Sequence, residues 1–249
     1  MKTSRELFER DGYVVLRKFL SSGEIQALGE KLERFIAEGV PGMPAEHVFY
    51  EQPGNGWTLK QLQHLDRYDP YFNVLFRSGK VAQLAERLLG NAAIAKNMQW
   101  FNKPPRIGKE TPPHQDGFYF MLEPNEALTM WLAIDHVDEA NGCVRYIPGS
   151  HRTGLRPHGK TGVLGFSQGI TDYGPRDAER EVPMVVEPGD LIVHHSLTIH
   201  RADANTSNRT RKGLGFIFYS ADAEEDEVKH RQYQEALKEE MLRSGRIGR

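Results

Sequence analysis

The chain has 249 residues with 32 lysines and arginines against 34 aspartates and glutamates, so it lacks the basic surplus expected of a nucleic-acid-binding protein. A single cysteine excludes an internal disulfide and favours a reducing compartment. The sequence shows no secretion signal and no run of about 18 apolar residues, so we expect a cytoplasmic globular protein that does not insert into a membrane.

The first ninety residues are expected to be largely helical. In chain order we expect a helix at 3–10, a β-rich run at 12–16, a helix at 24–38, a loop at 40–58 and a helix at 81–89. The second helix has apolar residues on one stripe and ends at Gly39. These patterns predict an N-terminal helical part that covers about residues 1–90.

The character of the sequence changes after residue 91. Short apolar or alternating runs occur at 92–101, 116–122, 127–135, 143–147, 182–186, 190–194 and 213–219. Short strands with turn signals between them predict an antiparallel sandwich or barrel, here at about 91–220. The polar stretch 151–181 is expected to be a loop or lid, and 223–243 a charged helix with Tyr233, Leu237 and Met241 on one stripe. We expect a single domain over 1–249.

A first candidate site lies in the segment Pro112-Pro113-His114-Gln115-Asp116-Gly117. If 114–122 is a strand, His114 and Asp116 point to the same face and could hold adjacent positions of a metal ion. Taken alone, a His-x-Asp pair is common by chance.

A second cluster downstream strengthens this interpretation. His200 and Arg211 flank a polar loop, and a symmetric hairpin would place their Cβ atoms about 5 Å apart. Two histidines and one carboxylate form the facial triad of non-haem Fe(II) oxygenases, which leaves positions for a 2-oxo acid and O₂. The planar fork of Arg211 could bind the distal carboxylate of 2-oxoglutarate.

The sequence resembles the phytanoyl-CoA dioxygenase (PhyH) family of Fe(II)/2-oxoglutarate-dependent oxygenases over nearly its whole length. The resemblance rests on Asp11-Gly12-Tyr13-Val14-Val15, His114-x-Asp116, Trp131-Leu132-Ala133-Ile134-Asp135, Asn141-Gly142-Cys143-Val144, Pro148-Gly149-Ser150-His151, Pro188-Gly189-Asp190, and His200 with Arg211. It implies a mainly β (α+β) fold, a double-stranded β-helix (a jelly-roll, cupin-like barrel) with flanking helices.

The same resemblance implies the chemistry. It makes His114, Asp116 and His200 the Fe(II) ligands and Arg211 the anchor of the co-substrate 2-oxoglutarate. It also places Lys60, Met98 and Trp131 beside the co-substrate. O₂ and 2-oxoglutarate would be consumed as a small organic molecule is hydroxylated, with release of succinate and CO₂. Many relatives carry Ser or Thr two residues after the second histidine, where this chain has Ala202, so one hydroxyl donor is missing.

Other histidines and a basic run compete for roles. One of His194 and His195 would point inward; we favour His200 as the third ligand, His195 as its supporting neighbour, and an ordinary structural role for His194. The basic residues Arg152, Arg156, His158 and Lys160 are expected to be solvated rather than to contact an anionic substrate.

Two alternative functions remain open at this stage. A cupin-like hydrolase or isomerase could use the same residues with Zn²⁺ or Mn²⁺, although it would need no carboxylate anchor at Arg211. A non-catalytic ligand-binding barrel is the other alternative. The sequence does not identify the substrate, although CoA esters are disfavoured because only the loop at 152–160 offers a basic groove for their phosphates. It also leaves the oligomeric state undetermined.

Overall fold

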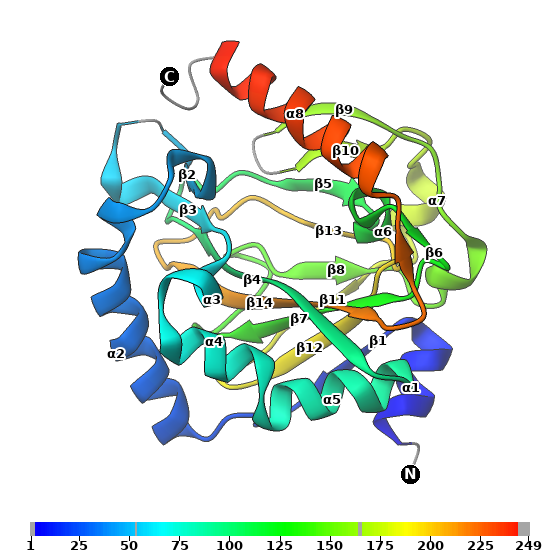
Figure 1. Ribbon diagram of the computed structural model, residues 1–249, viewed down its shortest axis with the longest axis horizontal. Coiled ribbons are helices and arrows are strands. Elements are labelled where there is room, and N and C mark those ends of the chain that lie inside the picture. Colours follow the sequence, from blue (N-terminus) through cyan, green and yellow to red (C-terminus); the bar gives the residue numbers. More distant parts are fainter. Residues whose placement is uncertain (1–2, 53, 164–165, 244–249) are drawn as a thin grey trace.

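A seven-stranded antiparallel sheet forms one wall of the molecule (Figure 1). The computed structural model describes residues 3–52, 54–163 and 166–243. In spatial order the strands are β1 (Tyr13–Leu16), β12 (Leu191–His195), β7 (Ala127–Ala133), β14 (Arg211–Ser220), β4 (Ala93–Lys103), β3 (Leu59–Leu62) and β2 (Val48–Tyr50). Because β1, β2 and β3 precede residue 63, the N-terminal part expected to be largely helical also contributes to the sheet.

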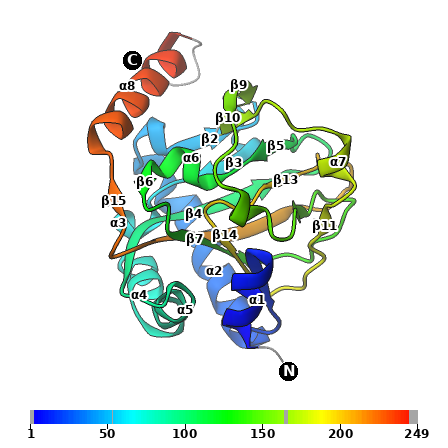
Figure 2. The same cartoon turned by 90° about the vertical axis from the view of Figure 1, so that its right-hand side faces the viewer.

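A four-stranded sheet lies opposite the large one (Figures 1 and 2). Its order is β11 (Val182–Pro183), β8 (Val144–Tyr146), β13 (His200–Ala202) and β5 (Thr111–His114). Two further antiparallel pairs are β9 (His158–Val163) with β10 (Phe166–Ile170) and β6 (Leu122–Glu123) with β15 (Glu224–Glu225). This arrangement confirms the predicted mainly β, α+β barrel of the jelly-roll type with flanking helices.

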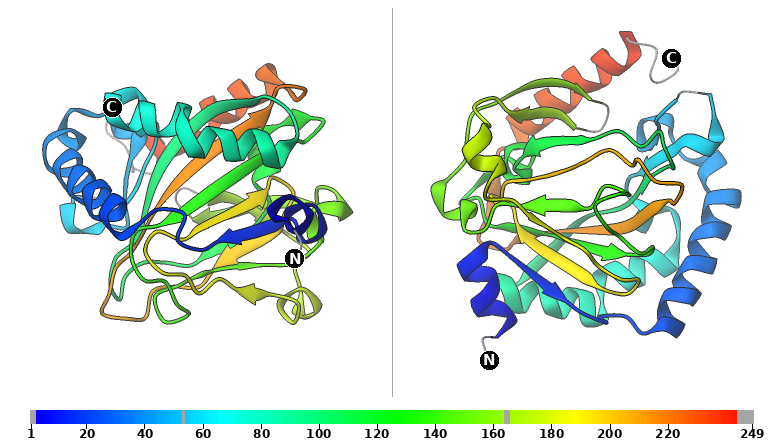
Figure 3. Two further views of the ribbon diagram at one scale, coloured as in Figure 1. Left: turned by 90° about the horizontal axis from the view of Figure 1, so that it is seen from below. Right: turned by 180° about the vertical axis from the view of Figure 1, so that it is seen from behind.

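Helices cover the outer face of the large sheet (Figure 3). They are α2 (Ser22–Glu38), α3 (Leu65–Tyr68), α4 (Pro70–Arg77) and α5 (Gly79–Leu89), while α1 (Ser4–Asp11) packs beside β1. Leu214, Phe216 and Phe218, alternate residues of β14, belong to the core with these helices and are almost fully buried. Each such side chain stabilises the fold by about 1.5–3 kcal/mol. The intervening residues of β14 face the barrel interior.

The helix at 24–38 begins two residues earlier than the apolar pattern predicts. Ser21 is its N-cap: the Ser21 hydroxyl accepts a hydrogen bond from the Glu24 amide, and the Glu24 carboxylate accepts one from the Ser21 amide at 2.7 Å. This reciprocal pair satisfies two otherwise orphaned N–H groups and starts the helix at Ser22.

Two other segments differ from the sequence-based expectation. The run at 116–122 is not a continuous strand, because β5 ends at His114 and a one-turn helix, α6 (Asp116–Phe120), follows. The stretch 151–181 is not simply loop, since it contains β9, β10 and α7 (Pro175–Ala178). The remaining short elements are 3-10 helices: η1 (Val40–Gly42), η2 (Ala45–His47), η3 (Gly56–Thr58) and η4 (Ser150–Thr153).

The C-terminal helix α8 (Glu227–Arg243) lies beside the barrel, near β9 and β10 (Figures 1 and 2). Two members of its expected apolar stripe face the barrel: the Tyr233 ring lies 6.1 Å from that of Tyr119, and Leu237 packs on Phe49. The side chain of Met241, the third member, lies outside the described part of the chain. Among the described helices, none is both long and apolar enough to cross a membrane.

Candidate active site

Three side chains able to bind a metal meet inside the barrel. His114 ends β5, His200 begins β13, and these two residues are partners in the antiparallel pairing of the strands. Asp116 is the first residue of α6, and its Oδ1 lies 3.5 Å from Nε2 of His114 and 3.7 Å from Nε2 of His200. One ligand atom from each residue lies within 4.8 Å of the others. The predicted set therefore converges, although the chain turns at Asp116 instead of continuing as a strand.

Backbone carbonyls orient both imidazoles. Nδ1 of His114 donates to the Pro112 carbonyl at 2.8 Å, and Nδ1 of His200 donates to the Thr198 carbonyl at 2.9 Å. Since a carbonyl only accepts, these bonds leave Nε2 of each ring turned towards Asp116. Burial and the neighbouring His114 and His194 hold the pKa of His200 well below its ordinary value, so its ring is neutral, the form that binds a metal.

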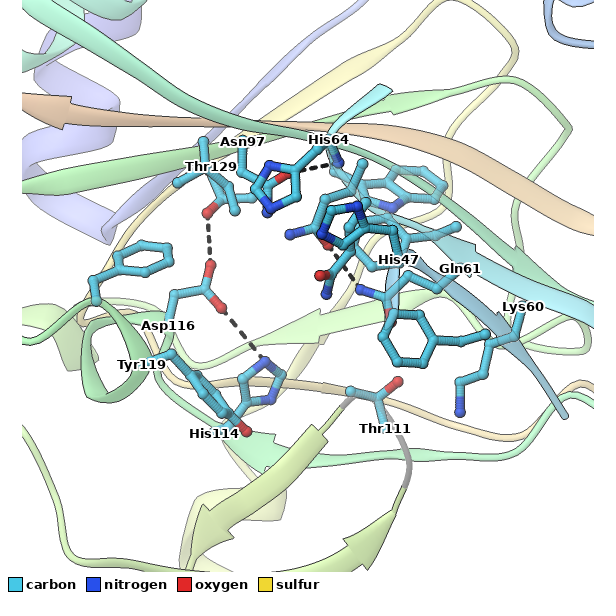
Figure 4. Close-up of a pocket in the computed structure, with 18 of the residues that line it drawn as sticks. His47, Lys60, Gln61, His64, Asn97, Thr111, His114, Asp116, Tyr119 and Thr129 are labelled. Carbon is cyan, nitrogen blue, oxygen red and sulfur yellow. Dashed lines mark hydrogen bonds and ion pairs between the residues drawn. The ribbon is translucent and has the colours of Figure 1, made fainter. Parts of the chain in front are cut away.

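The Asp116 carboxylate is held by its other oxygen. Oδ2 accepts hydrogen bonds from the Thr129 hydroxyl at 2.6 Å and from Nε2 of His194 at 3.0 Å (Figure 4 shows the first). Burial alone would raise the pKa of Asp116, but the neighbouring His114 and His194 hold it well below its ordinary value. The carboxylate is thus an anion with Oδ1 directed at the two other ligands.

The neighbour that supports Asp116 is His194, and the prediction of His195 for this role is wrong. Tyr146 donates its hydroxyl to Nδ1 of His194 at 2.8 Å, which leaves Nε2–H of His194 for Asp116. His195 points the other way, with Nε2 3.3 Å from a Glu126 carboxylate oxygen and its ring beside Phe8. Consecutive residues of β12 face opposite sides of the sheet, so only one of the two histidines can point into the barrel, and it is His194.

We expect His194→Ala to weaken Fe(II) binding by about 10- to 100-fold, because Asp116 loses the donor that orients it. Anaerobic titration with Fe(II) measures this effect. His195→Ala is the matched control and should bind Fe(II) like the wild type. Equal weakening in both variants would show that the Tyr146–His194–Asp116 chain has no role in holding the metal.

Arg211 lies at the start of β14, in the large sheet, whereas His200 lies in the small one. The prediction that they face each other across a hairpin is therefore wrong, because the intervening loop crosses between sheets. The buried Arg211 Nε donates to the Gly142 carbonyl at 3.1 Å, and the guanidinium carbon lies 5.2 Å from the centre of the Trp131 ring. Burial lowers the pKa of Arg211 to about 10, so the guanidinium stays charged at neutral pH.

A second basic side chain, which no sequence motif singles out, lies beside Arg211. Lys103 is its partner in the β4–β14 register, is buried, and donates from Nζ to the carbonyls of Ala202, at 3.3 Å, and Asp203. Burial, Arg211 and Lys60 hold the pKa of Lys103 well below its ordinary value. Its only signal in the sequence is a lysine at the end of an apolar strand.

Lys60 also lies at this end of the cavity, with Nζ 3.4 Å from Oε1 of the buried Glu51. Lys60, Lys103 and Arg211 bring three basic side chains to this end of the cavity, and the Glu51 carboxylate lies beside Lys60. Buried like charges repel each other, and an anionic ligand would relieve that repulsion. This end of the cavity therefore fits a carboxylate-bearing molecule.

Trp131 lines the cavity as predicted, but the placement of Met98 there is wrong. Met98 is fully buried in the core shared with the outer helices, opposite Phe216 of β14. Its neighbour Gln99 faces the cavity instead. The alternation of β4 accounts for the error, because a shift of one residue exchanges the two faces of a strand.

A cavity of about 700 Å³ extends from the three ligands towards α8. On the β3–β4 wall, Gln61 and His64 lie across the open space from Asp116 and His114 (Figure 4). His64 has a left-handed backbone with φ 58°, an uncommon conformation for a residue other than glycine. Its amide donates to Oδ1 of Asn97 at 3.0 Å.

His64 is expected to make the protein less stable in acid. Burial lowers its pKa from 6.5 to about 4, so the folded state binds this proton less readily than the unfolded state. The free energy of unfolding should therefore be unaffected by this group above pH 6.5 and fall as the pH drops from 6.5 to about 4. His64→Asn, which tolerates the left-handed backbone, should flatten this part of the stability profile measured by denaturant unfolding. Parallel profiles for both proteins would contradict the assignment.

Comparison with known proteins gives consistent matches. The family model "Phytanoyl-CoA dioxygenase (PhyH)" matches residues 8–213. Peroxisomal phytanoyl-CoA dioxygenase of Rattus norvegicus is 30% identical over 239 residues, which cover 90% of this chain and 70% of the relative. The family match includes His114, Asp116, His200 and Arg211 and ends before α8.

Solved structures agree with these matches. The non-heme alpha ketoglutarate dependent carbocyclase SnoK from nogalamycin biosynthesis is 25% identical, with a TM-score of 0.72 over 90% of this chain and 86% of that one. EvdO2 from Micromonospora carbonacea var. aurantiaca, complexed with 2-oxoglutarate, is 25% identical, with a TM-score of 0.69 over 89% of this chain and 91% of that one.

Proposed function

Because this chain belongs to the phytanoyl-CoA dioxygenase (PhyH) family and is an Fe(II)- and 2-oxoglutarate-dependent oxygenase, we propose that it hydroxylates a C–H bond of a small organic molecule. His114, Asp116 and His200 are the proposed iron ligands. Arg211 is the proposed anchor of 2-oxoglutarate. The observation that carries this assignment is the His-Asp-His group, with both histidines buried, in one cavity with the buried basic side chains Lys60, Lys103 and Arg211.

The donor set fits Fe(II). Two imidazole nitrogens and one carboxylate oxygen, each oriented by a further hydrogen bond, are the donors that non-haem iron takes on one face. When bound, iron together with 2-oxoglutarate supplies the oxidising power that inserts an oxygen atom of O₂ into a C–H bond, with release of succinate and CO₂. The residues of the chain position the reactants and keep water away.

The basic end of the cavity fits 2-oxoglutarate. The guanidinium of Arg211 offers paired donors for the distal carboxylate, and Trp131 covers its face. Lys103 and Lys60 are further basic side chains at this end of the cavity, and a bound dianion would favour their charged forms.

Thr111 is the proposed replacement for the hydroxyl that is missing at Ala202. Ala202 is buried, and its partner across the β5–β13 ladder is Thr111, which lines the cavity (Figure 4). A Thr111 hydroxyl can donate one hydrogen bond to a bound carboxylate, worth about 1.5–3 kcal/mol when the acceptor is charged. Although position 202 is alanine, this end of the cavity therefore still has a hydroxyl group.

Hydroxylation is the outcome we propose among those that this fold supports. SnoK is named a carbocyclase, so an enzyme with a similar fold catalyses ring closure instead. Asp116 supplies a carboxylate ligand. This favours hydroxylation over halogenation, which needs a small residue at this position so that a halide ion can bind. The alternative of a Zn²⁺ or Mn²⁺ hydrolase or isomerase finds no support in the family or in the similar structures.

The test is anaerobic addition of Fe(II) and 2-oxoglutarate to the purified protein. We expect a weak visible charge-transfer band in the wild type and no band in His114→Ala. On admission of air, succinate should form from 2-oxoglutarate. A wild-type protein that binds Fe(II) but gives neither band nor succinate would refute the proposed function.

The proposed compartment is the cytoplasm. Cys143 is buried and forms no disulfide, which suits a reducing environment. The relative from Rattus norvegicus is named as peroxisomal, so fractionation of cells that express the full chain decides between the two compartments.

A further inference from the structure

A cluster of uncharged polar side chains on the β3–β4 wall is not used by the metal or the co-substrate as proposed above. Gln61 donates from Nε2 to Oε1 of Gln99 at 2.8 Å, and both amides are buried and line the cavity. Oε1 of Gln61 and Nδ1 of His64 are also buried, and neither has a hydrogen-bond partner among the described residues. Asn97 and His64 complete this group, which we term the amide wall.

Unpartnered buried polar atoms are rare in folded proteins, because each one gives up its hydrogen bonds to water without replacement. The two in the amide wall belong to side chains that face His114 and Asp116 across the cavity (Figure 4). His64 is also held in a strained left-handed backbone, and such strain is concentrated at functional sites. Both features are explained if a ligand supplies the missing partners.

The chemistry of the surroundings defines that ligand. Amides donate and accept without charge, and burial lowers the pKa of His47 and His64, which leaves both rings neutral at pH 7. Aromatic side chains line the rest of this region, namely Phe49, Phe101, Tyr119, Phe120, Tyr219 and Tyr233. Flat aromatic faces beside amides suit a ring that carries hydroxyl or amide groups.

Among the described residues, two of the lysines that line the cavity are already paired with carboxylates and are less available to CoA phosphates. Lys96 is paired with Glu225 at 2.7 Å, and Lys238 is paired with Glu46 at 2.9 Å. Two members of the basic run at 152–160 are engaged elsewhere: Arg156 bonds Asp172 and Asp177, and His158 stacks on Phe118. A cavity of about 700 Å³ is large enough for a second organic molecule beside the co-substrate.

We propose that Gln61, with Gln99 and His64, binds the prime substrate, and that this substrate is an uncharged ring compound bearing hydroxyl or amide groups. That the bound molecule is then hydroxylated rests on the proposed function. Its binding to these residues does not depend on that function. Gln61 Oε1 accepts a hydrogen bond from the polar edge of the substrate, and Nδ1 of His64 accepts or donates a second one. The opposite edge then faces His114 and Asp116, where the C–H bond is attacked.

The test uses the double variant Gln61→Leu/Gln99→Leu, because removing both partners leaves no new unpaired amide. Calorimetry is done without air, in the presence of Fe(II) and 2-oxoglutarate. The uncharged probes are myo-inositol and methyl β-D-glucopyranoside, and the charged probes are glucose 6-phosphate and palmitoyl-CoA. Gln26→Leu, on the exposed face of α2, is the matched control.

We expect an uncharged probe to bind the wild type and Gln26→Leu, and to bind the double variant at least tenfold more weakly. The melting temperature of the ligand-free double variant should equal or exceed that of the wild type, because an unsatisfied acceptor is removed. Binding of charged probes alone, equal binding to all three proteins, no probe binding, or a clearly lower melting temperature would overturn the inference. Loss of the visible band in the wild type would instead refute the proposed function.

Discussion

Replacing Asp116 with alanine is expected to abolish stable Fe(II) binding and to lower succinate formation by at least about 10³-fold, an effect of roughly 4 kcal/mol on the barrier. Asp116 is the one carboxylate in the His114–Asp116–His200 group. Without it, two imidazoles remain, which do not supply the negative charge that the hard ferrous ion prefers. Anaerobic Fe(II) titration and a succinate assay measure the two effects.

The control for this variant is Asp222→Ala, which removes an exposed carboxylate after β14. It should bind Fe(II) and form succinate like the wild type. Melting curves of both variants separate loss of the ligand from loss of the fold, because Asp116 also accepts hydrogen bonds from Thr129 and His194. A folded Asp116→Ala protein with wild-type iron affinity would remove Asp116 from the ligand set.

The sequence predicts the fold class and the metal-ligand candidates because both depend on local patterns. Alternating runs such as 127–135 and 213–219 are strands in the structure, as β7 and β14. His114, Asp116 and His200 belong to short motifs that stay recognisable whatever the exact path of the chain. The structure adds that these three side chains lie together in one cavity, which no local sequence pattern could establish.

Two of the predicted site residues were wrong by one position, and both errors have the same physical cause. Met98 and Gln99, like His195 and His194, are neighbours on a strand, so their side chains point to opposite faces. The pairing decides which face is inside: His194 lies opposite Tyr13 of β1, and Met98 lies opposite Phe216 of β14. Both partners are distant in sequence, so the inward residue could not be identified from the strand alone.

The turn at Asp116 could not be predicted for a different reason. Asp116-Gly117-Phe118-Tyr119-Phe120 is rich in aromatic residues, which favour a strand. Distant groups hold it as one helical turn: the Gly117 amide donates to the Ser196 carbonyl, and Asn125 donates to the Gly117 carbonyl. Tertiary contacts thus override the local preference and bring the carboxylate to the two histidines.

Arg211→Met is expected to raise the KM for 2-oxoglutarate by about 10²–10⁴-fold, because two charge-assisted hydrogen bonds of about 1.5–3 kcal/mol each are lost. Methionine retains an apolar stem against Trp131 but removes the cationic fork. The kcat should fall much less than kcat/KM, since the three metal ligands are unchanged. Steady-state assays of succinate formation at varied 2-oxoglutarate concentrations measure both constants.

A distal-carboxylate anchor also predicts a change of preference, which a general structural role for Arg211 does not. The wild type should prefer 2-oxoglutarate strongly over 2-oxohexanoate, which lacks the distal carboxylate, and Arg211→Met should accept the two about equally. Arg209→Met is the matched control, because Arg209 is half-exposed and pairs with Asp138 at 2.6 Å. If Arg211→Met keeps the wild-type preference, the carboxylate is held elsewhere, and Lys103, buried opposite Arg211 on β4, is then its anchor.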